Sequence, residues 1–477
     1  MKKNTKIVCT LGPSSDDISE LEPMIIAGMN VARLNFSHGD YEHMKKIFAN
    51  LRKAEKNTGK TIAILQDLQG PKIRLGLLPE QGVPVKHGQR VIFSTGTDTF
   101  KPGPIATFPV QYKNLHNDVK KGDLILVDDG YFELKVEKKD GRNIYCHVQN
   151  GGIFKSHKGI NCPTASISAK ALSTKDKEDL AFGVKQGIDY VALSFVKNAK
   201  DIEELRALLV RYKAPHVKII AKIERREAIE PETLEAIAQA ADGLMVARGD
   251  LGIEIPAEQV PIVQKEIVRY GLLYAKPVII ATQILESMIK SPRATRAEIS
   301  DAATAIFEHA DALMLSGETS VGDYPVEAVR TLSKVARATE HALHGKEHLL
   351  SNHLVAIDMH ITDATCYNAA LLAKHIQADC IVVLTRTGYT ARQIMKHRPS
   401  TPTIVITYDP QVKKELELIW GLNDILVLNE HDRIESAAEA AKRVPALLKP
   451  LGVIKPNREL VIVNAGKRHN FITTVVV

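Results

Sequence analysis

The chain repeats a short pattern in which a run of mostly apolar residues ends in polar side chains. Residues 217–224, Val-Lys-Ile-Ile-Ala-Lys-Ile-Glu, show the pattern, and residues 243–250, Gly-Leu-Met-Val-Ala-Arg-Gly-Asp, repeat it. Apolar runs of this length are typical of parallel strands that are covered on both faces. The pattern predicts eight such strands, at residues 6–11, 30–36, 61–67, 190–195, 217–224, 243–250, 277–282 and 312–316.

Helical patterns lie between most of these runs. Examples are residues 16–27, 178–186, 199–211, 260–274 and 325–341. One strand, one helix and two loops need roughly 30 residues, which matches the spacing of most of the runs. We therefore expect an α/β fold built on a (β/α)8 barrel, the TIM barrel, in which the active site lies at the carboxyl ends of the strands.

Two further domains accompany the predicted barrel. The long interval between Asp67 and Tyr190 contains apolar or alternating runs at 90–93, 124–127 and 132–136, with Asp-Gly turns at 129–130 and 140–141, and this indicates an inserted all-β lid. After the polar stretch 341–353, a helix at 363–376 and strands at 380–384, 403–407 and 460–463 indicate a C-terminal α/β domain. The predicted boundaries are 1–70 with 168–345 for the barrel, 71–167 for a β-barrel lid and 346–477 for the last domain.

The composition is that of a globular protein of about three domains. The 477 residues are 44% hydrophobic and 25% charged, with a mean hydropathy of -0.10. No apolar run approaches the ~18 to 20 residues of a membrane-spanning helix. The sequence opens Met-Lys-Lys-Asn-Thr-Lys without an apolar leader, and its five scattered cysteines contain no C-x-x-C. We expect a cytoplasmic protein with reduced thiols, no zinc site and no contact with a membrane.

The net charge of +7 is spread over the chain without a block of Lys and Arg residues, which argues against a nucleic-acid partner. It fits an anionic small-molecule substrate, and it equally fits a charge that only aids solubility. Two patterns are decoys. Gly59-Lys60-Thr61 looks like the end of a P-loop, but Ala54 stands where that motif needs glycine, so we predict a helix C-cap. The 17 histidines include no H-E-x-x-H zinc motif.

Polar side chains at the predicted strand ends form the candidate active site, because these ends meet at one barrel mouth. They are Arg33, Asn35, Ser37, Asp67, Lys222, Glu224, Arg248, Gly249, Asp250, Thr282, Gln283, Ser316, Gly317 and Glu318.

Glu224 and Asp250 end adjacent strands and offer oxygen ligands for a hard divalent cation, Mg²⁺ or Mn²⁺. The alternative is two unrelated solvated acids. Lys222 lies on the same strand face as Glu224, ~6.6 Å away along the strand. It is predicted to act as an electrophile, and the alternative is that it only forms a buried ion pair with Glu224. Arg33 offers a planar fork for phosphate or carboxylate. Phosphoryl transfer needs this gathering of positive charge.

Seven segments resemble the pyruvate kinase family, and together they cover essentially the whole chain. They are residues 5–13 (TKIVCTLGP), 30–39 (NVARLNFSHG), 67–74 (DLQGPKIR), 219–224 (IIAKIE), 245–252 (MVARGDLG), 281–288 (ATQILESM) and 314–319 (MLSGET). The resemblance implies transfer of the phosphoryl group of phosphoenolpyruvate to ADP, which gives ATP and, after protonation of enolpyruvate, pyruvate. It also implies a homotetramer.

By this resemblance, Arg33 holds the substrate phosphate, Lys222 stabilises the transferred phosphoryl group, and Glu224 with Asp250 binds the divalent cation. Further positions that the resemblance implies are grouped by role: Gly249, Asp250 and Thr282 around the substrate carboxylate; Ser316 and Glu318 near the enol-protonating side; Asn35, Ser37, His38, Arg74 and Lys158 on the nucleotide; Asn35, Ser37, Asp67 and the Leu68 carbonyl on a monovalent cation.

Two positions bear on regulation and on the monovalent cation. Lys72 stands where potassium-dependent members of the family usually carry glutamate, so we predict activity without added K⁺. The loop Thr385-Arg-Thr-Gly-Tyr-Thr390 follows a strand and precedes a helix, and it resembles the loop where sugar phosphates bind in the family. Its candidate effector residues are Thr385, Thr387, Gly388 and Thr390. The alternative is an ordinary turn capped by Thr390.

Two other functions remain open from the sequence. A Mg²⁺-dependent barrel lyase or aldolase acting on a keto acid would need the same carboxylates and arginine, but not ADP. A non-catalytic scaffold for a regulator or nucleic acid would not need the mouth residues at all. Pyruvate formation measured with and without ADP separates the three.

Overall fold

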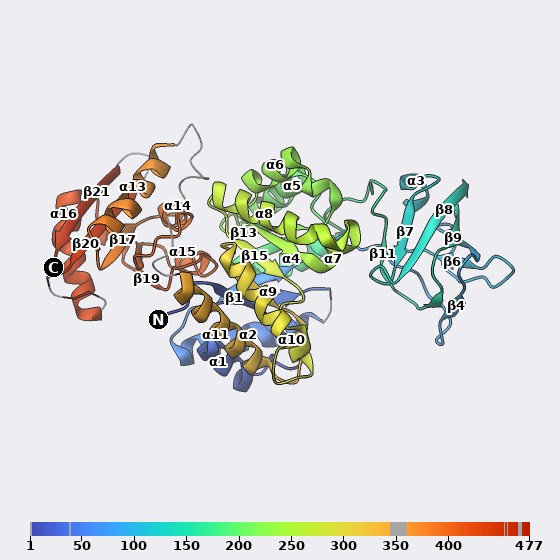
Figure 1. Ribbon diagram of the computed structural model, residues 1–477, viewed down its shortest axis with the longest axis horizontal. Coiled ribbons are helices and arrows are strands. Elements are labelled where there is room, and N and C mark those ends of the chain that lie inside the picture. Colours follow the sequence, from blue (N-terminus) through green and yellow to red (C-terminus); the bar gives the residue numbers. More distant parts are fainter. Residues whose placement is uncertain (1, 38–39, 344–359, 453, 456, 466–469) are drawn as a thin grey trace.

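The computed structural model describes residues 2–37, 40–343, 360–452, 454–455, 457–465 and 470–477. A helix-covered barrel lies at the centre, with a small sheet domain at one end and an α/β domain at the other (Figure 1). None of the described helices combines the length and the apolar character that crossing a membrane requires.

The eight predicted strands close into one parallel barrel, which confirms the predicted fold class. Their order around the barrel is β1-β16-β15-β14-β13-β12-β3-β2. The bounds are β1 (Lys6–Thr10), β2 (Val31–Asn35), β3 (Ala63–Asp67), β12 (Tyr190–Leu193), β13 (Lys218–Ile223), β14 (Gly243–Ala247), β15 (Val278–Ala281) and β16 (Ala312–Leu315).

The barrel has two apolar layers because side chains alternate along each strand. Outward-facing residues such as Ile219 and Ala221 join the large core under the helices, and inward-facing residues such as Ile220 fill the barrel. The covering helices are α1 (Ile18–Ala27), α2 (Tyr41–Thr58), α4 (Thr174–Gln186), α5 (Ala199–Arg211), α6 (Pro231–Ala240), α7 (Arg248–Glu254), α8 (Val260–Leu273), α9 (Arg296–Phe307), α10 (Gly317–Ser320) and α11 (Pro325–Leu343). Gly59 caps α2 in the left-handed region, at φ 67°, as predicted for the P-loop decoy.

One predicted strand end is wrong. The sequence pattern predicts an extended run over residues 243–250, but β14 stops at Ala247 and Arg248 begins helix α7. Tertiary contacts turn the chain there, because the Gly249 amide donates to the Thr282 hydroxyl at 2.9 Å and Arg248 donates to the Thr282 and Gln283 carbonyls. Asp250 therefore lies in the first turn of a helix and not on a strand.

The insertion is all-β apart from one helical turn, and it has its own core. Its six-stranded sheet has the order β11-β7-β8-β9-β5-β6, beside a two-stranded β10-β4 sheet. The bounds are β4 (Val83–Val85), β5 (Arg90–Ser94), β6 (Thr107–Pro109), α3 (Leu115–Asp118), β7 (Leu124–Val127), β8 (Phe132–Asp140), β9 (Asn143–Val148), β10 (Gly152–Phe154) and β11 (Ile160–Asn161). We call residues 71–167 the lid; its boundaries, like those of the other domains, stay predictions.

The last domain is a five-stranded sheet in the order β19-β18-β17-β20-β21. Its elements are α13 (Ile361–His375), β17 (Cys380–Leu384), α14 (Tyr389–Met395), β18 (Thr403–Thr407), α15 (Pro410–Glu415), β19 (Asp424–Val427), α16 (Ala437–Leu448), β20 (Glu459–Ala465) and β21 (Asn470–Val476). It packs on the amino ends of the barrel strands through the buried ion pair Arg398–Asp311, at 3.0 Å, and the pair Lys218–Glu415, at 3.1 Å. The opposite barrel end stays free of this domain.

Candidate active site

The alternation of side chains along the strands brings the predicted residues into the barrel mouth. On β13, Lys222 shares the inward face with Ile220, whereas Ile219, Ala221 and Ile223 face the helices. The same period places Arg33 two residues beyond Val31 on β2, and Asp67 two residues beyond Leu65 on β3. The apolar filling of the barrel thus forms the floor beneath these polar groups.

A cavity of about 330 Å³ opens at this end. Of the predicted residues, it is lined by Arg33, Asn35, Asp67, Lys222, Glu224, Asp250, Thr282, Ser316 and Gly317. The structure does not bring Ser37, Leu68, Gly249, Glu318, Arg74 or Lys158 into its lining. His38 lies outside the described residues.

Lys222 is the centre of the charged network. Its Nζ lies 2.8 Å from Glu224 Oε1 and 3.3 Å from Asp67 Oδ1, and it donates to Ser194 Oγ at 2.7 Å. Burial alone would lower the pKa of Lys222, but the Asp67 and Glu224 carboxylates outweigh it and raise this pKa above its usual value. Lys222 is therefore a fixed cation at the cavity wall.

Arg33 is held by two of its three guanidinium nitrogens. Its Nε donates to Asp67 Oδ2 at 2.7 Å and its Nη1 to Thr10 Oγ1 at 2.8 Å. Burial opposes ionisation of Asp67, but Lys222 and Arg33 together hold the pKa of this carboxyl below its usual value. No described residue accepts a hydrogen bond from Nη2 of Arg33. This nitrogen remains available to an anion in the cavity.

Glu224 and Asp250 fit a divalent cation. Glu224 is fully buried, its Oε2 accepts from the Phe195 amide at 2.6 Å, and its Oε1 has no hydrogen bond of good geometry among the described residues. Burial, with the nearby Asp250 carboxylate, raises the pKa of Glu224 although Lys222 opposes the shift. Two hard oxygen ligands in need of positive charge suit Mg²⁺ or Mn²⁺.

No group of three or more acidic, histidine or cysteine side chains is arranged for a metal in the part of the chain that the structure describes. Two carboxylates alone leave most coordination positions to water and substrate oxygens, which is how Mg²⁺ is usually held beside phosphates.

Thr282 and Gly249 are joined by a hydrogen bond. Thr282 has the strained φ of 67°, and its hydroxyl accepts the Gly249 amide. The resemblance places that amide near a substrate carboxylate. In the structure its hydrogen bond to Thr282 instead fixes the start of α7. The Thr282 hydroxyl still has its own proton to donate into the cavity.

Ser316 and Glu318 separate in the structure. Both oxygens of Glu318 accept backbone amides, from Leu285 at 3.0 Å and Ser316 at 2.7 Å, so this buried carboxylate braces two loops. Ser316 lines the cavity, and its buried hydroxyl has no hydrogen-bond partner among the described residues. Of the two, Ser316 is the residue that belongs to the cavity lining.

The nucleotide positions are divided between mouth and lid. Asn35 lines the cavity and accepts the Ser37 amide at 3.1 Å. Arg74 donates to the His157 carbonyl at 3.0 Å, and Lys158 pairs with Asp128 at 2.8 Å. Both contacts lie within the lid, so the structure does not bring Arg74 and Lys158 to the mouth cavity.

Thr10, Ser194 and Ser320 are mouth residues that sequence reasoning missed. Thr10 and Ser320 line the cavity, and Ser194 joins Lys222 to the Leu68 carbonyl, to which it donates at 2.7 Å. Thr10 ends β1, and Ser194 directly follows β12. The rule that found the other residues, a polar group at a strand end, would have found these two.

The loop that we predicted to bind an effector is a strand-to-helix turn with its own contacts. Gly388, at φ 72°, is the residue that precedes α14, so the alternative of a cap by Thr390 is wrong. The Thr390 hydroxyl donates to the Ala465 carbonyl at 3.2 Å, and Arg392 donates to the Thr387 carbonyl at 3.4 Å. The side chain of Thr387 is not used in any of these contacts.

The mouth of this (β/α)8 barrel combines two carboxylates, a buried lysine and an arginine with one unpaired guanidinium nitrogen. This combination defines a metal-dependent barrel enzyme that acts on an anionic substrate. Comparisons with known proteins narrow this class. The family description "Pyruvate kinase, barrel domain" matches residues 2–329, and "Pyruvate kinase, alpha/beta domain" matches residues 363–475. The chain belongs to the pyruvate kinase family.

Individual relatives agree over nearly the full length. The pyruvate kinase of Geobacillus stearothermophilus is 43% identical over 471 residues, which cover 98% of this chain and 78% of the relative. That of Bacillus licheniformis is 41% identical over 466 residues, 97% of this chain and 78% of the relative. A crystal structure of a pyruvate kinase from Cryptosporidium parvum matches with a TM-score of 0.90 at 34% identity, over 99% of this chain and 96% of that one. The chain is therefore a phosphotransferase, and the comparisons do not support the lyase or aldolase alternative.

Proposed function

We propose that the mouth cavity binds phosphoenolpyruvate, ADP and a divalent cation, and that it transfers the phosphoryl group to give pyruvate and ATP. The observation that carries this proposal is the Lys222 ammonium, fixed between Asp67 and Glu224 on the wall of a cavity that Asp250 also lines. This network supplies positive charge at the place where negative charge shifts during phosphoryl transfer.

Glu224 and Asp250 are the residues that would hold the divalent cation, Mg²⁺ or Mn²⁺. When bound, the cation supplies positive charge that neutralises the oxygens of both reactants. Two like charges ~4 Å apart repel by roughly 1 kcal/mol in water and ~4 kcal/mol at an effective dielectric constant of 20. The need for neutralisation therefore grows as the lid excludes water.

The chain's own residues then have separate tasks. Arg33 binds the substrate phosphate through the free Nη2 of its guanidinium, and Lys222 stabilises the phosphoryl group as it leaves. Thr282 orients the substrate carboxylate with its remaining proton. By the family resemblance, Ser316 lies near the side from which the enolate takes its proton. The lid brings Arg74 and Lys158 to the nucleotide when it closes over the mouth.

A coupled assay of pyruvate formation tests this function. We expect pyruvate from phosphoenolpyruvate only when ADP and Mg²⁺ or Mn²⁺ are both present. Pyruvate formed at the same rate without ADP would contradict the proposal and favour a lyase-like reaction. No pyruvate under any condition, from protein that melts cooperatively, would favour a non-catalytic scaffold.

The proposed monovalent site carries the next prediction. By the family resemblance, Asn35, Ser37, Asp67 and the Leu68 carbonyl form the monovalent site, and the Lys72 ammonium takes the charge role of K⁺ there. We expect full activity in buffer free of potassium and sodium, and we expect Lys72→Glu to make the rate depend on added KCl. A wild-type rate that rises manyfold on adding KCl would reject the assignment, and Lys86→Glu, at an exposed lid position, is the charge-matched control.

We also propose that Thr385, Thr387, Gly388 and Thr390 form a phosphate-binding loop for a sugar-phosphate effector. The support is the resemblance together with the Thr387 side chain, which the loop's own hydrogen bonds leave unused. We expect Thr387→Glu to abolish any activation by sugar phosphates while leaving the basal rate unchanged, because a carboxylate repels phosphate. Activation that survives the change would remove the assignment; Thr365→Glu, at a half-buried position of α13, is the control.

We also propose that the protein is a homotetramer and that it is located in the cytoplasm. The tetramer rests on the family resemblance. The five cysteines are free and buried, and burial raises the pKa of each thiol, which fits a reducing compartment.

A further inference from the structure

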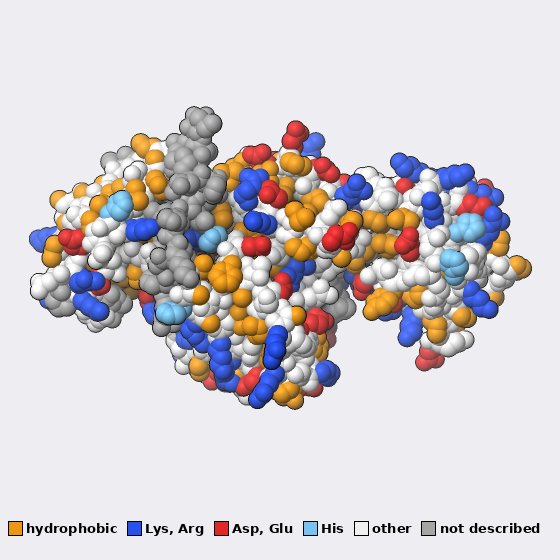
Figure 2. Space-filling model, in the orientation of Figure 1, with side chains coloured by type: hydrophobic (Ala, Val, Ile, Leu, Met, Phe, Trp, Pro, Cys, Tyr) orange, Lys and Arg blue, Asp and Glu red, His pale blue; other side chains and the backbone are white. Residues whose placement is uncertain are grey.

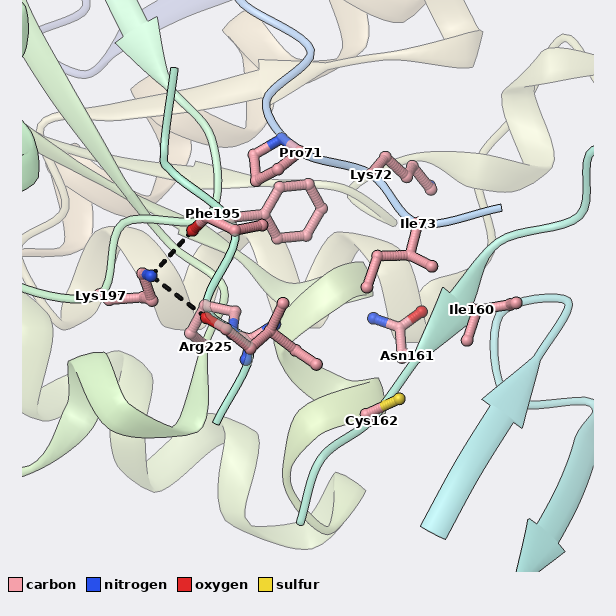
Figure 3. Close-up of a pocket in the computed structure, with 11 residues that line it drawn as sticks. Pro71, Lys72, Ile73, Ile160, Asn161, Cys162, Phe195, Lys197 and Arg225 are labelled. Atoms are coloured by element: carbon pink, nitrogen blue, oxygen red, sulfur yellow. Dashed lines mark hydrogen bonds between the residues drawn. The ribbon is translucent and has the colours of Figure 1, made fainter. Parts of the chain in front are cut away.

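The joint between lid and barrel lies directly on residues next to the proposed active-site groups. Figure 2 shows that the lid joins the barrel through a narrow neck. The outgoing segment, residues 71–73, and the returning segment, residues 160–162, flank a cavity of about 30 Å³ that Phe195 and Arg225 of the barrel also line (Figure 3). Phe195 follows Ser194 and Arg225 follows Glu224, so the joint and the active site share the same strand ends.

The returning segment is fixed at one end. Lys197, in the loop after β12, donates from Nζ to the carbonyls of Ile167 at 3.2 Å and Ala169 at 2.9 Å, the contacts dashed in Figure 3. These bonds tie residues 167–169 to the barrel. The free part of the segment is therefore the stretch before them, which includes β11 and its last residue, Asn161.

Asn161 reaches the barrel through one polar contact. Its Nδ2 donates to Glu254 Oε1 at 3.4 Å, and the other carboxylate oxygen, Oε2, lies 3.8 Å from Arg225 Nε. The side chains of Arg225 and Glu254 are 9% and 1% exposed. Glu254 Oε2 has no hydrogen-bond partner among the described residues, so Arg225 and Glu254 form an ion pair without a direct hydrogen bond in this lid position.

A buried ion pair adds little net stability, and one with an unsatisfied oxygen adds less. Its position is more informative. Glu254 lies four residues after Asp250 on α7, so the two carboxylates share one face of a short helix. Arg225 directly follows Glu224. Both partners of the pair are thus connected, through a few backbone bonds, to the two proposed metal ligands.

We propose that Arg225 and Glu254 are a positioning pair that couples the lid, through Asn161, to the two metal-binding carboxylates. Closing the lid moves Asn161 with β11, turns the Glu254 carboxylate and draws Arg225 onto its unpartnered oxygen. Asp250 and Glu224 take their working orientation with that movement. This inference rests on the proposed assignment of Glu224 and Asp250 to the metal.

Glu254→Gln in the full chain tests the pair, with Mn²⁺ as the probe. We expect about tenfold lower kcat and about tenfold weaker Mn²⁺ binding, the size of effect that loss of a group behind a metal ligand produces. The KM for phosphoenolpyruvate should change little, because Arg33 is untouched. Glu227→Gln removes the other carboxylate partner of Arg225, at 3.3 Å and partly exposed, and should leave kcat and Mn²⁺ binding unchanged.

A lower melting temperature for Glu254→Gln with unchanged kcat and Mn²⁺ affinity would overturn the proposal, since a purely structural contact predicts that result. If this variant does not fold, Asn161→Ala decides: kcat and Mn²⁺ binding both reduced support the coupling, and both unchanged reject it. Glu224→Gln in the same titration separates the two levels. Mn²⁺ binding that does not depend on Glu224 overturns the metal assignment, whereas binding that depends on Glu224 but not on Glu254 overturns only the positioning pair.

Discussion

Replacing Lys222 with methionine is expected to lower kcat by about 10²- to 10³-fold, the loss typical of removing one fixed charge or donor from the place where negative charge develops. Methionine keeps the length of the side chain and removes its charge. The two carboxylates that Lys222 neutralises, Asp67 and Glu224, would then lie together in a buried site. The measurement is steady-state kcat at saturating phosphoenolpyruvate and ADP.

The matched control for this variant is Lys218→Met on the same strand. Lys218 pairs with Glu415 at the opposite end of the barrel, so its loss should affect stability and leave kcat nearly unchanged. Lys222→Arg restores the charge but not the compact geometry of an ammonium, and we expect only partial recovery. Equal losses of kcat in Lys222→Met and Lys218→Met would show that Lys222 acts through stability alone, and the assignment would be wrong.

The sequence predicts the strand-borne half of the site well, for a simple physical reason. Alternation along an extended chain is local, so once the inward face of β13 is known, the direction of Lys222 follows from its place in the run. The same alternation places Arg33 and Asp67, and it places Thr10 as well once the first strand is followed to its end. Closure of the barrel then brings these separate ends together.

The positions that sequence reasoning misplaced depend on contacts between distant segments. Asp250 is on a helix because the Thr282 hydroxyl accepts the Gly249 amide at the start of α7. Glu318 turns away from the cavity because its two oxygens accept backbone amides from two loops. None of these three hydrogen bonds leaves a mark in the local sequence pattern. The distance of Arg74 and Lys158 from the mouth depends on the angle of the lid, which is set at the joint and not within the lid sequence.

Removing one of the two carboxylates that we propose as metal ligands is the second large effect that the site predicts. We expect Glu224→Gln and Asp250→Asn each to weaken Mn²⁺ binding by at least about 100-fold, since loss of a group behind a ligand already costs about 10- to 100-fold. Activity should fall in parallel at a fixed metal concentration. Mn²⁺ titration and kcat at rising Mn²⁺ measure both.

The two variants should differ in how far added metal restores them. Asp250 lies in the first turn of α7 and is partly exposed, so water can replace its oxygen, and high Mn²⁺ should recover much of the activity of Asp250→Asn. Glu224 is fully buried, and it also holds Lys222 by an ion pair of 2.8 Å. Its loss removes a ligand and frees the lysine to turn toward Asp67, so added metal should recover Glu224→Gln much less. Glu258→Gln, an exposed acid just beyond α7, should match the wild type in both measurements. Equal and complete recovery of both variants at high Mn²⁺ would mean that Glu224 does no more than attract the ion, and that its contact with Lys222 has no separate role in the reaction.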